Sequence, residues 1–104
     1  MNEASVDIVV DPHSENARLV FRGDLTFSHI SSVKVKLEGF LLDWRGRSLV
    51  MDIENVTALD LSFLQLIEAT IVFLEQHGKE YSLNWDIEEE LKDLLLRTGF
   101  EKYV

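Results

Sequence analysis

The chain contains no cysteine, one proline and five glycines in 104 residues. Without cysteine, disulfide bridges, thiolate nucleophiles and cysteine metal ligands are all excluded. No apolar run approaches the roughly 20 residues that a membrane-spanning helix needs. Residues 1–5 also lack the basic start and the apolar core of a signal peptide. The sequence therefore predicts a cytoplasmic protein with no segment inserted directly into a membrane.

Positive charge is scarce, with 10 Lys and Arg against 19 Asp and Glu and a formal net charge of −9. A surface of that sign repels phosphate backbones, so we expect no nucleic-acid partner. The 46% hydrophobic content is that of a folding chain. The length suits a single domain over residues 1–104. Solubility explains the charge most simply, and attraction to a basic protein partner is the alternative.

The residue patterns that mark enzymes are also missing. His13, His29 and His77 have no metal-ligand spacing such as H-x-x-x-H. There is no glycine-rich phosphate loop and no nucleophile paired with a base. The three glutamates at 88–90 occupy consecutive helical positions, which point in different directions and indicate a solvated first turn. We therefore expect no enzyme, with no catalytic residues, no metal and no cofactor.

Residues 48–64 organise the rest of the chain. The apolar run from Leu49 to Ile53 predicts a buried strand. A short loop follows, and Asp60 is the expected N-cap of a helix. That helix carries apolar residues at the spacing of one helix face, namely Leu64, Ile67, Ile71 and Leu74. This arrangement places residues 60–62 beyond the carboxyl end of a strand, where ligands and partners bind in open α/β sheets.

The other elements follow from the same periodicities. Alternating apolar residues predict strands at 6–10, 18–22 and 80–85, and helical spacing predicts a first helix over about 28–42. Residues 23–28 are expected to be a loop, and Asp86 is expected to cap a last helix that ends near Arg97. The first two strands form a hairpin, and the later strands alternate with helices. The order predicts an α/β fold with right-handed crossovers and a mostly parallel sheet.

Three segments resemble motifs of the STAS domain family, named for sulfate transporters and anti-sigma-factor antagonists. Residues 23–26, Gly-Asp-Leu-Thr, look like the family's G-(E/D)-L-(D/T) segment. Residues 52–64 are similar to its signature, a strand followed by V-x-x-(I/M/L)-D-(S/T)-(S/T/A)-G-L. Residues 95–100 look like its terminal L-x-x-(T/S)-G-(L/F). The resemblance implies a small mixed sheet of about four strands with helices packed on one side.

The resemblance also implies a function. Members of the family mostly do no chemistry and bind protein partners around the signature loop and the following helix. In sigma-factor circuits the partner is an anti-sigma factor that is also a serine kinase, and it phosphorylates the hydroxyl residue just after the signature Asp. Here Asp60 matches that Asp, but Leu61 stands at the acceptor position and has no hydroxyl. Ser62 keeps a hydroxyl one position later, where it is at most a minor acceptor.

Six residues are therefore predicted to bind or regulate a partner: Asp24, Thr26, Asp60, Leu61, Ser62 and Phe63. Each has a structural alternative. Asp60 is also the expected helix cap, and Asp24 and Thr26 suit turn formation. Leu61 and Phe63 form a contact patch if both are exposed, and Phe63 replaces the glycine that the family usually has there.

Two readings of the function remain open. The first is a signalling adaptor of the anti-sigma-factor antagonist type, a monomer or weak dimer that binds a kinase-like or other regulatory protein. The second is a small STAS subunit of a larger assembly, such as a phospholipid-transport or chemosensory complex. Because Leu61 has no hydroxyl, constitutive binding is favoured over a phosphorylation switch.

Overall fold

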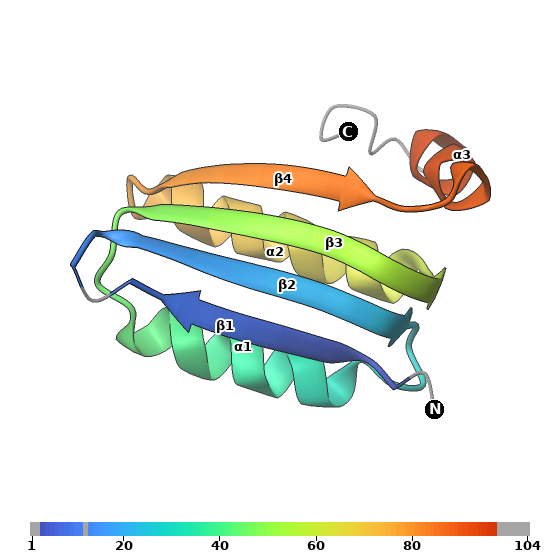
Figure 1. The fold of residues 1–104 in the computed structure, drawn as a ribbon, viewed down its shortest axis with the longest axis horizontal. Coiled ribbons are helices and arrows are strands. Elements are labelled where there is room, and N and C mark those ends of the chain that lie inside the picture. Colours follow the sequence, from blue (N-terminus) through green and yellow to red (C-terminus); the bar gives the residue numbers. More distant parts are fainter. Residues whose placement is uncertain (1–2, 12, 98–104) are drawn as a thin grey trace.

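The structure, a computed structural model, describes residues 3–11 and 13–97. Within them the strands are β1 (Ser5–Val10), β2 (Asn16–Leu25), β3 (Ser48–Leu59) and β4 (Glu80–Asp86). The helices are α1 (Ser31–Asp43), α2 (Leu61–Gln76) and α3 (Glu89–Arg97). Figure 1 shows the strands side by side in front of α1 and α2. Residues 98–100 of the expected motif at 95–100 lie outside the described residues.

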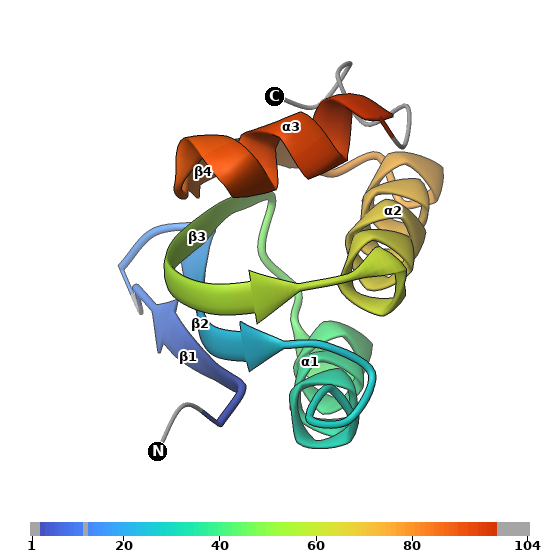
Figure 2. The same cartoon turned by 90° about the vertical axis from the view of Figure 1, so that its right-hand side faces the viewer.

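The sheet has the strand order β1-β2-β3-β4. β1 pairs antiparallel with β2, whereas β2–β3 and β3–β4 are parallel. α1 connects β2 to β3, and α2 connects β3 to β4. Each new strand joins the sheet at the same growing edge. Right-handed crossovers then place both helices on one face, as Figure 2 shows, while α3 lies across the β4 end of the molecule. The predicted mixed, mostly parallel α/β fold is confirmed.

The core lies between the sheet and the layer formed by α1 and α2. Alternate residues of β2 and β3 point into it, and Leu19, Phe21, Met51 and Ile53 are completely buried. The four predicted core positions of α2, Leu64, Ile67, Ile71 and Leu74, are also completely buried. β3 lies between two parallel neighbours in the sheet. Parallel strands are covered by helices, so the apolar run of β3 predicted this central position.

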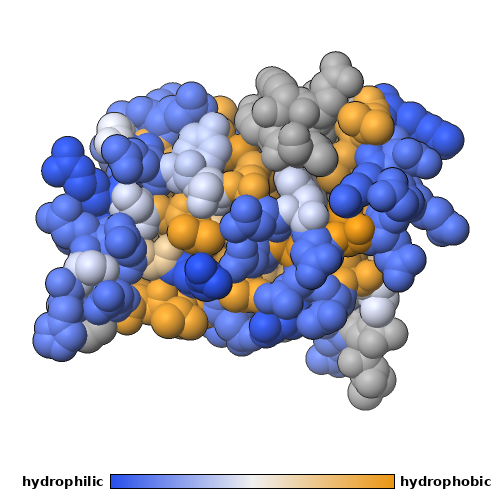
Figure 3. All heavy atoms as spheres, turned by 45° about the horizontal axis from the view of Figure 1, so that its top comes forward, coloured by the Kyte–Doolittle hydropathy of each residue, from blue (hydrophilic) through white to orange (hydrophobic). Residues whose placement is uncertain are grey.

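The opposite face of the sheet carries polar side chains that pair across strands. On one row Arg22 contacts Asp7 of β1 and Glu54 of β3. On another row Asp52 of β3 contacts Arg18 of β2 and accepts a hydrogen bond from Asn84 of β4. Figure 3 looks over β4 and this outer face, and it shows hydrophobic atoms in the gaps between hydrophilic side chains. These pairs lie on the face opposite α1 and α2, and they bring charges of opposite sign together.

Several boundaries differ from those predicted. β2 continues to Leu25, so Asp24 belongs to a strand and not to a loop. β3 continues to Leu59 because Asn55, at φ 51°, absorbs a register shift against β2. Asparagine tolerates this left-handed conformation better than most residues, so the strand bulges where a loop was expected. The prediction that Asp86 caps the last helix is wrong, since Asp86 ends β4 and α3 begins at Glu89.

Candidate functional site

Asp60 joins two segments at the carboxyl end of the sheet. Its backbone is extended, which is the N-cap conformation, and Oδ1 accepts a hydrogen bond from the Ser62 amide at 2.9 Å. Its second oxygen, Oδ2, accepts one from the Phe27 amide, also at 2.9 Å. The carboxylate thus satisfies a free donor of the first helical turn and also holds the β2–α1 loop. The predicted cap is confirmed, and the second bond is an addition that the sequence did not reveal.

The β2–α1 connection is ordered by its own polar residues. The Thr26 hydroxyl donates to Asp24 Oδ1 at 2.6 Å, and His29 Nε2 lies 3.3 Å from Asp24 Oδ2. Gly23 has φ 91°, and a Cβ on it would overlap the Glu3 carbonyl oxygen, so this position requires glycine. Asp24 pairs in register with Ala58, which brings this segment beside the start of α2. Both predicted residues lie near Asp60, but their side chains are engaged in shaping the loop.

Two large apolar side chains project from this end into solvent. Leu61, the first residue of α2, is 54% exposed, and Phe27 is 76% exposed. The backbone of Phe27 is bonded to Asp60, the residue that precedes Leu61. Sequence reasoning missed Phe27, although an aromatic residue in an otherwise polar loop was a usable signal. Ser62 is partly exposed and occupies the second position of α2.

Phe63 does not belong to this surface. The prediction grouped it with Leu61 as an apolar contact patch, but its side chain is completely buried. Its ring meets the ring of Phe21 at 5.4 Å between centroids and that of Trp85 at 6.3 Å, both in edge-on geometry. Consecutive helical residues point about 100° apart, so the exposure of Leu61 turns Phe63 toward the sheet. Phe63 is therefore a core residue and not a contact residue.

A groove continues from this end along the layer formed by α1 and α2. It consists of two hollows of about 450 Å³ and 330 Å³, both lined by Glu38, Leu66 and Ala69. The first also includes Phe27 and Ser62. Eight large hydrophobic residues are exposed in the described chain, and five of them lie on α1, α2 or the loop before α1: Phe27, Val35, Leu42, Leu61 and Val72. Exposed apolar surface is thus concentrated on the helical side.

The described residues at this end offer exposed apolar surface beside the N-terminus of α2. In residues 3–11 and 13–97, no group of three His, Cys, Asp or Glu is placed to hold a metal ion. None of the described helices combines the length and apolar character that crossing a membrane requires. Trp44 belongs to the core, since it is buried and stacks on Phe40.

Comparison with known proteins agrees with this architecture. Among solved structures, the Bacillus cell fate determinant SpoIIAA in its phosphorylated form is similar, with a TM-score of 0.67 and 12% identity. The match covers 95% of this chain and 87% of SpoIIAA. Mglu in its native form is similar with a TM-score of 0.56 and 15% identity, over 76% of this chain and 23% of Mglu. At these identities the likeness concerns the fold alone.

The comparison with curated proteins finds no significant match. The model of one protein family, described as the STAS domain, matches residues 7–104. That span contains all three motifs on which the resemblance rested. The chain therefore belongs to the STAS domain family.

Proposed function

We propose that this STAS domain is a non-catalytic regulatory module that binds a protein partner, kinase-like or of another regulatory class. The contact surface is the end of the helical layer formed by Phe27, Asp60, Leu61 and Ser62. The observation that carries the proposal is the exposure of two side chains that adjoin Asp60: Phe27, whose amide binds its carboxylate, and Leu61, the next residue. Large apolar side chains held in fixed positions on a surface are typical anchors of protein interfaces.

Asp24 and Thr26 have a supporting role in this proposal. Their mutual hydrogen bond shapes the segment that presents Phe27, so they position the contact surface even where a partner does not touch them. Preorganisation of this kind favours binding because less conformational freedom is lost when the complex forms. The module acts as a monomer or weak dimer.

The regulation of this contact follows from the residue after Asp60. Leu61 cannot be phosphorylated, and SpoIIAA, which has a similar fold, is known in a phosphorylated form. We therefore propose that binding through Leu61 is constitutive. This property also suits the alternative function, a STAS subunit of a larger assembly such as a transport or chemosensory complex. Copurification at fixed stoichiometry through size-exclusion chromatography favours the subunit, and a complex that exchanges during the run favours the adaptor.

The proposal is tested by binding with matched serine variants. A partner is first isolated from host lysate on the immobilised chain, identified by mass spectrometry and purified. Phe27→Ser and Leu61→Ser should each weaken its binding by about tenfold or more. Val9→Ser is the control, because Val9 is 59% exposed on β1, outside the helical layer, and it should bind as the parent does. If only the Val9 variant loses affinity, the interface lies elsewhere and the proposal fails.

A further inference from the structure

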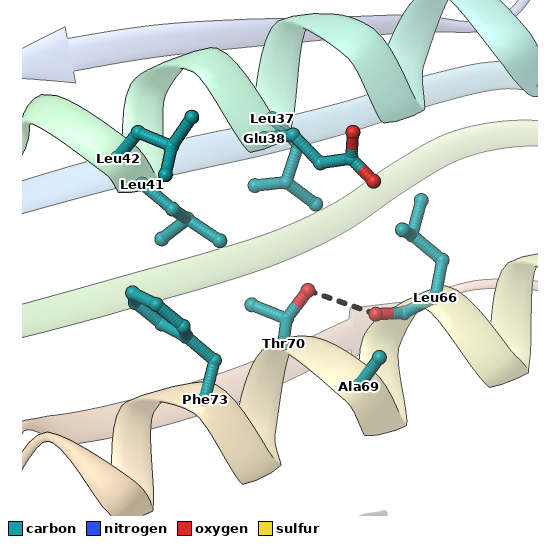
Figure 4. A pocket seen from close by; sticks show the side chains of 8 residues that line it. All are labelled: Leu37, Glu38, Leu41, Leu42, Leu66, Ala69, Thr70 and Phe73. Carbon is teal, nitrogen blue, oxygen red and sulfur yellow. Dashed lines mark hydrogen bonds between the residues drawn. The ribbon is translucent and has the colours of Figure 1, made fainter.

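The half of the α1–α2 groove farther from Phe27 is lined almost entirely by apolar side chains. Figure 4 shows side chains from both helices pointing into it, and its residues are Leu37, Glu38, Leu41, Leu42, Leu66, Ala69, Thr70 and Phe73. The hydroxyl of Thr70 donates to the Leu66 carbonyl at 2.8 Å, so it is engaged within α2. The walls of this half groove therefore present hydrocarbon and aromatic surface.

Glu38 is the one charged residue in that lining. Its side chain is exposed, and it belongs to none of the ion pairs found among residues 3–11 and 13–97. Lys34 lies one helical turn before it and lines the neighbouring hollow, yet no ion pair joins the two. The groove thus has an apolar floor and one carboxylate that lies where its two halves meet, beside Leu66.

We infer that this half groove receives an amphipathic helix of the partner, with an Arg or Lys that pairs with Glu38. Apolar residues of that helix, spaced i, i+3 or i+4 and i+7, would pack against Leu41, Leu66 and Phe73. The ridges of one helix pack into the grooves of another, and Val35 and Leu42 extend the apolar ridge of α1. The net charge of −9 favours a basic segment further.

This inference rests on the proposed function in one respect, because the occupant belongs to a protein partner. It assigns a second contact, separate from Leu61, and a chemical class for the segment that binds there. Charge complementarity selects a basic amphipathic helix over two other occupants, a second copy of this acidic chain and an uncharged acyl chain. Those two remain distinct outcomes of the test.

The test uses three synthetic helical peptides of about 16 residues, long enough to run beside most of a helix of this size. All carry leucines at helical spacing on one face, and they differ only in one residue beside that face, which is Arg, Gln or Glu. Binding is measured by titration, and its location by backbone amide shifts in NMR spectra. We expect shifts at Leu41, Leu66 and Phe73. We also expect the Arg peptide to bind about fivefold more tightly than the Glu peptide.

Charge reversal supplies the decisive comparison. Glu38→Arg should invert the order so that the Glu peptide binds more tightly. Glu75→Arg changes the net charge equally at an exposed position of α2 outside the groove, and it should leave the order unchanged. Equal effects of the two variants would mean nonspecific attraction, and shifts confined to the Phe27 end would mean that this half groove binds nothing; either result overturns the inference. Dimerisation that shifts the amides of Leu41, Leu66 and Phe73, or binding of decanoate in place of peptide, would overturn it too.

The outcomes also separate this inference from the proposed function. Loss of partner binding in Leu61→Ser, with no peptide bound between α1 and α2, would leave the proposed function standing and remove the helix site. Peptide binding with the expected charge preference, together with an unaffected Leu61→Ser variant, would do the reverse.

Discussion

Asp60 accepts a hydrogen bond from the backbone amide of Phe27, 33 positions earlier in the chain. The same carboxylate caps α2 through the amide of Ser62. One side chain therefore fixes both the start of a helix and the loop that carries the most exposed aromatic residue of the proposed interface. Asp60 thus caps α2 and also positions the proposed contact surface, so its replacement should affect stability and binding together.

Asp60→Ala should lower the free energy of unfolding by about 1–2 kcal/mol, because it removes the helix cap and leaves a second amide without its acceptor. Asp60→Asn keeps one acceptor oxygen and should lose less. Urea denaturation followed by circular dichroism measures both changes. Glu75→Ala is the control on the exposed side of α2 and should stay within about 0.5 kcal/mol of the parent. Equal stability of Asp60→Ala and the parent would show that neither bond contributes.

Replacing Gly39 or Gly46 by alanine should change the stability of the protein in opposite directions. A Cβ on Gly39, inside α1, meets nothing within 4 Å, so Gly39→Ala should stabilise the protein by about 0.5–1 kcal/mol through helix propensity. A Cβ on Gly46 would overlap the indole of Trp44 and the carbonyl of Glu15. Gly46→Ala should therefore destabilise by about 1–3 kcal/mol, the usual cost of overpacking. Thermal unfolding of both variants checks the pair, and shifts of the same sign would contradict the packing around Trp44.

Phe63→Ala should cost about 3–5 kcal/mol, because the ring is completely buried between Phe21 and Trp85. Phe27→Ala makes the same chemical change at a site that is 76% exposed, and it should alter stability by less than about 0.5 kcal/mol. Chemical denaturation of the two variants separates a core residue from a contact residue. A small effect at Phe63 would restore it to the surface patch that the sequence predicted.

The sequence predicted most of the fold because hydrophobic periodicity records which face of an element is covered. The spacing in α2 identified four of its six buried residues, and the run in β3 identified an interior strand. Periodicity failed where a backbone detail decided the outcome, as at Asn55, whose left-handed conformation extends β3 past the expected loop. The site was predicted less well because it depends on contacts between distant segments. The pairing of Asp60 with Phe27 has no local signal, and the side of α2 that Phe63 faces depends on the exact start of the helix.

We expect phosphorylation not to govern this protein through position 61, and Ser62 to be at most a minor acceptor. Leu61 has no hydroxyl. The Ser62 amide is already engaged by the Asp60 carboxylate two residues earlier, whose negative charge opposes a phosphate on Ser62. Intact-mass measurement of the protein purified from its own host is the test. One phosphate per molecule on Ser62 would contradict this expectation and establish a switch displaced by one residue.

Ser62→Asp should leave the fold intact and weaken partner binding. Position 62 is the second residue of α2, where the helix dipole favours a negative charge by about 0.3–1 kcal/mol, and repulsion from Asp60 offsets part of that gain. The melting temperature should therefore change little. A partner that covers this helix end would bury the new charge beside Leu61 and Phe27 without a counter-ion, which costs several kcal/mol when the charge is fully desolvated. We expect a binding constant weaker by a factor of about ten or more, equivalent to about 1.4 kcal/mol.

A second aspartate variant tests whether the position of the added charge decides its effect on binding. Gln76→Asp adds the same charge in the last turn of α2, at an exposed residue far along the helix from Asp60. There the dipole disfavours an anion, so this variant should be slightly less stable. Its affinity for the partner should nevertheless match that of the parent, because the proposed interface lies at the opposite end. If Ser62→Asp binds as tightly as the parent, while both variants melt as expected, the N-terminal end of α2 is not the contact surface.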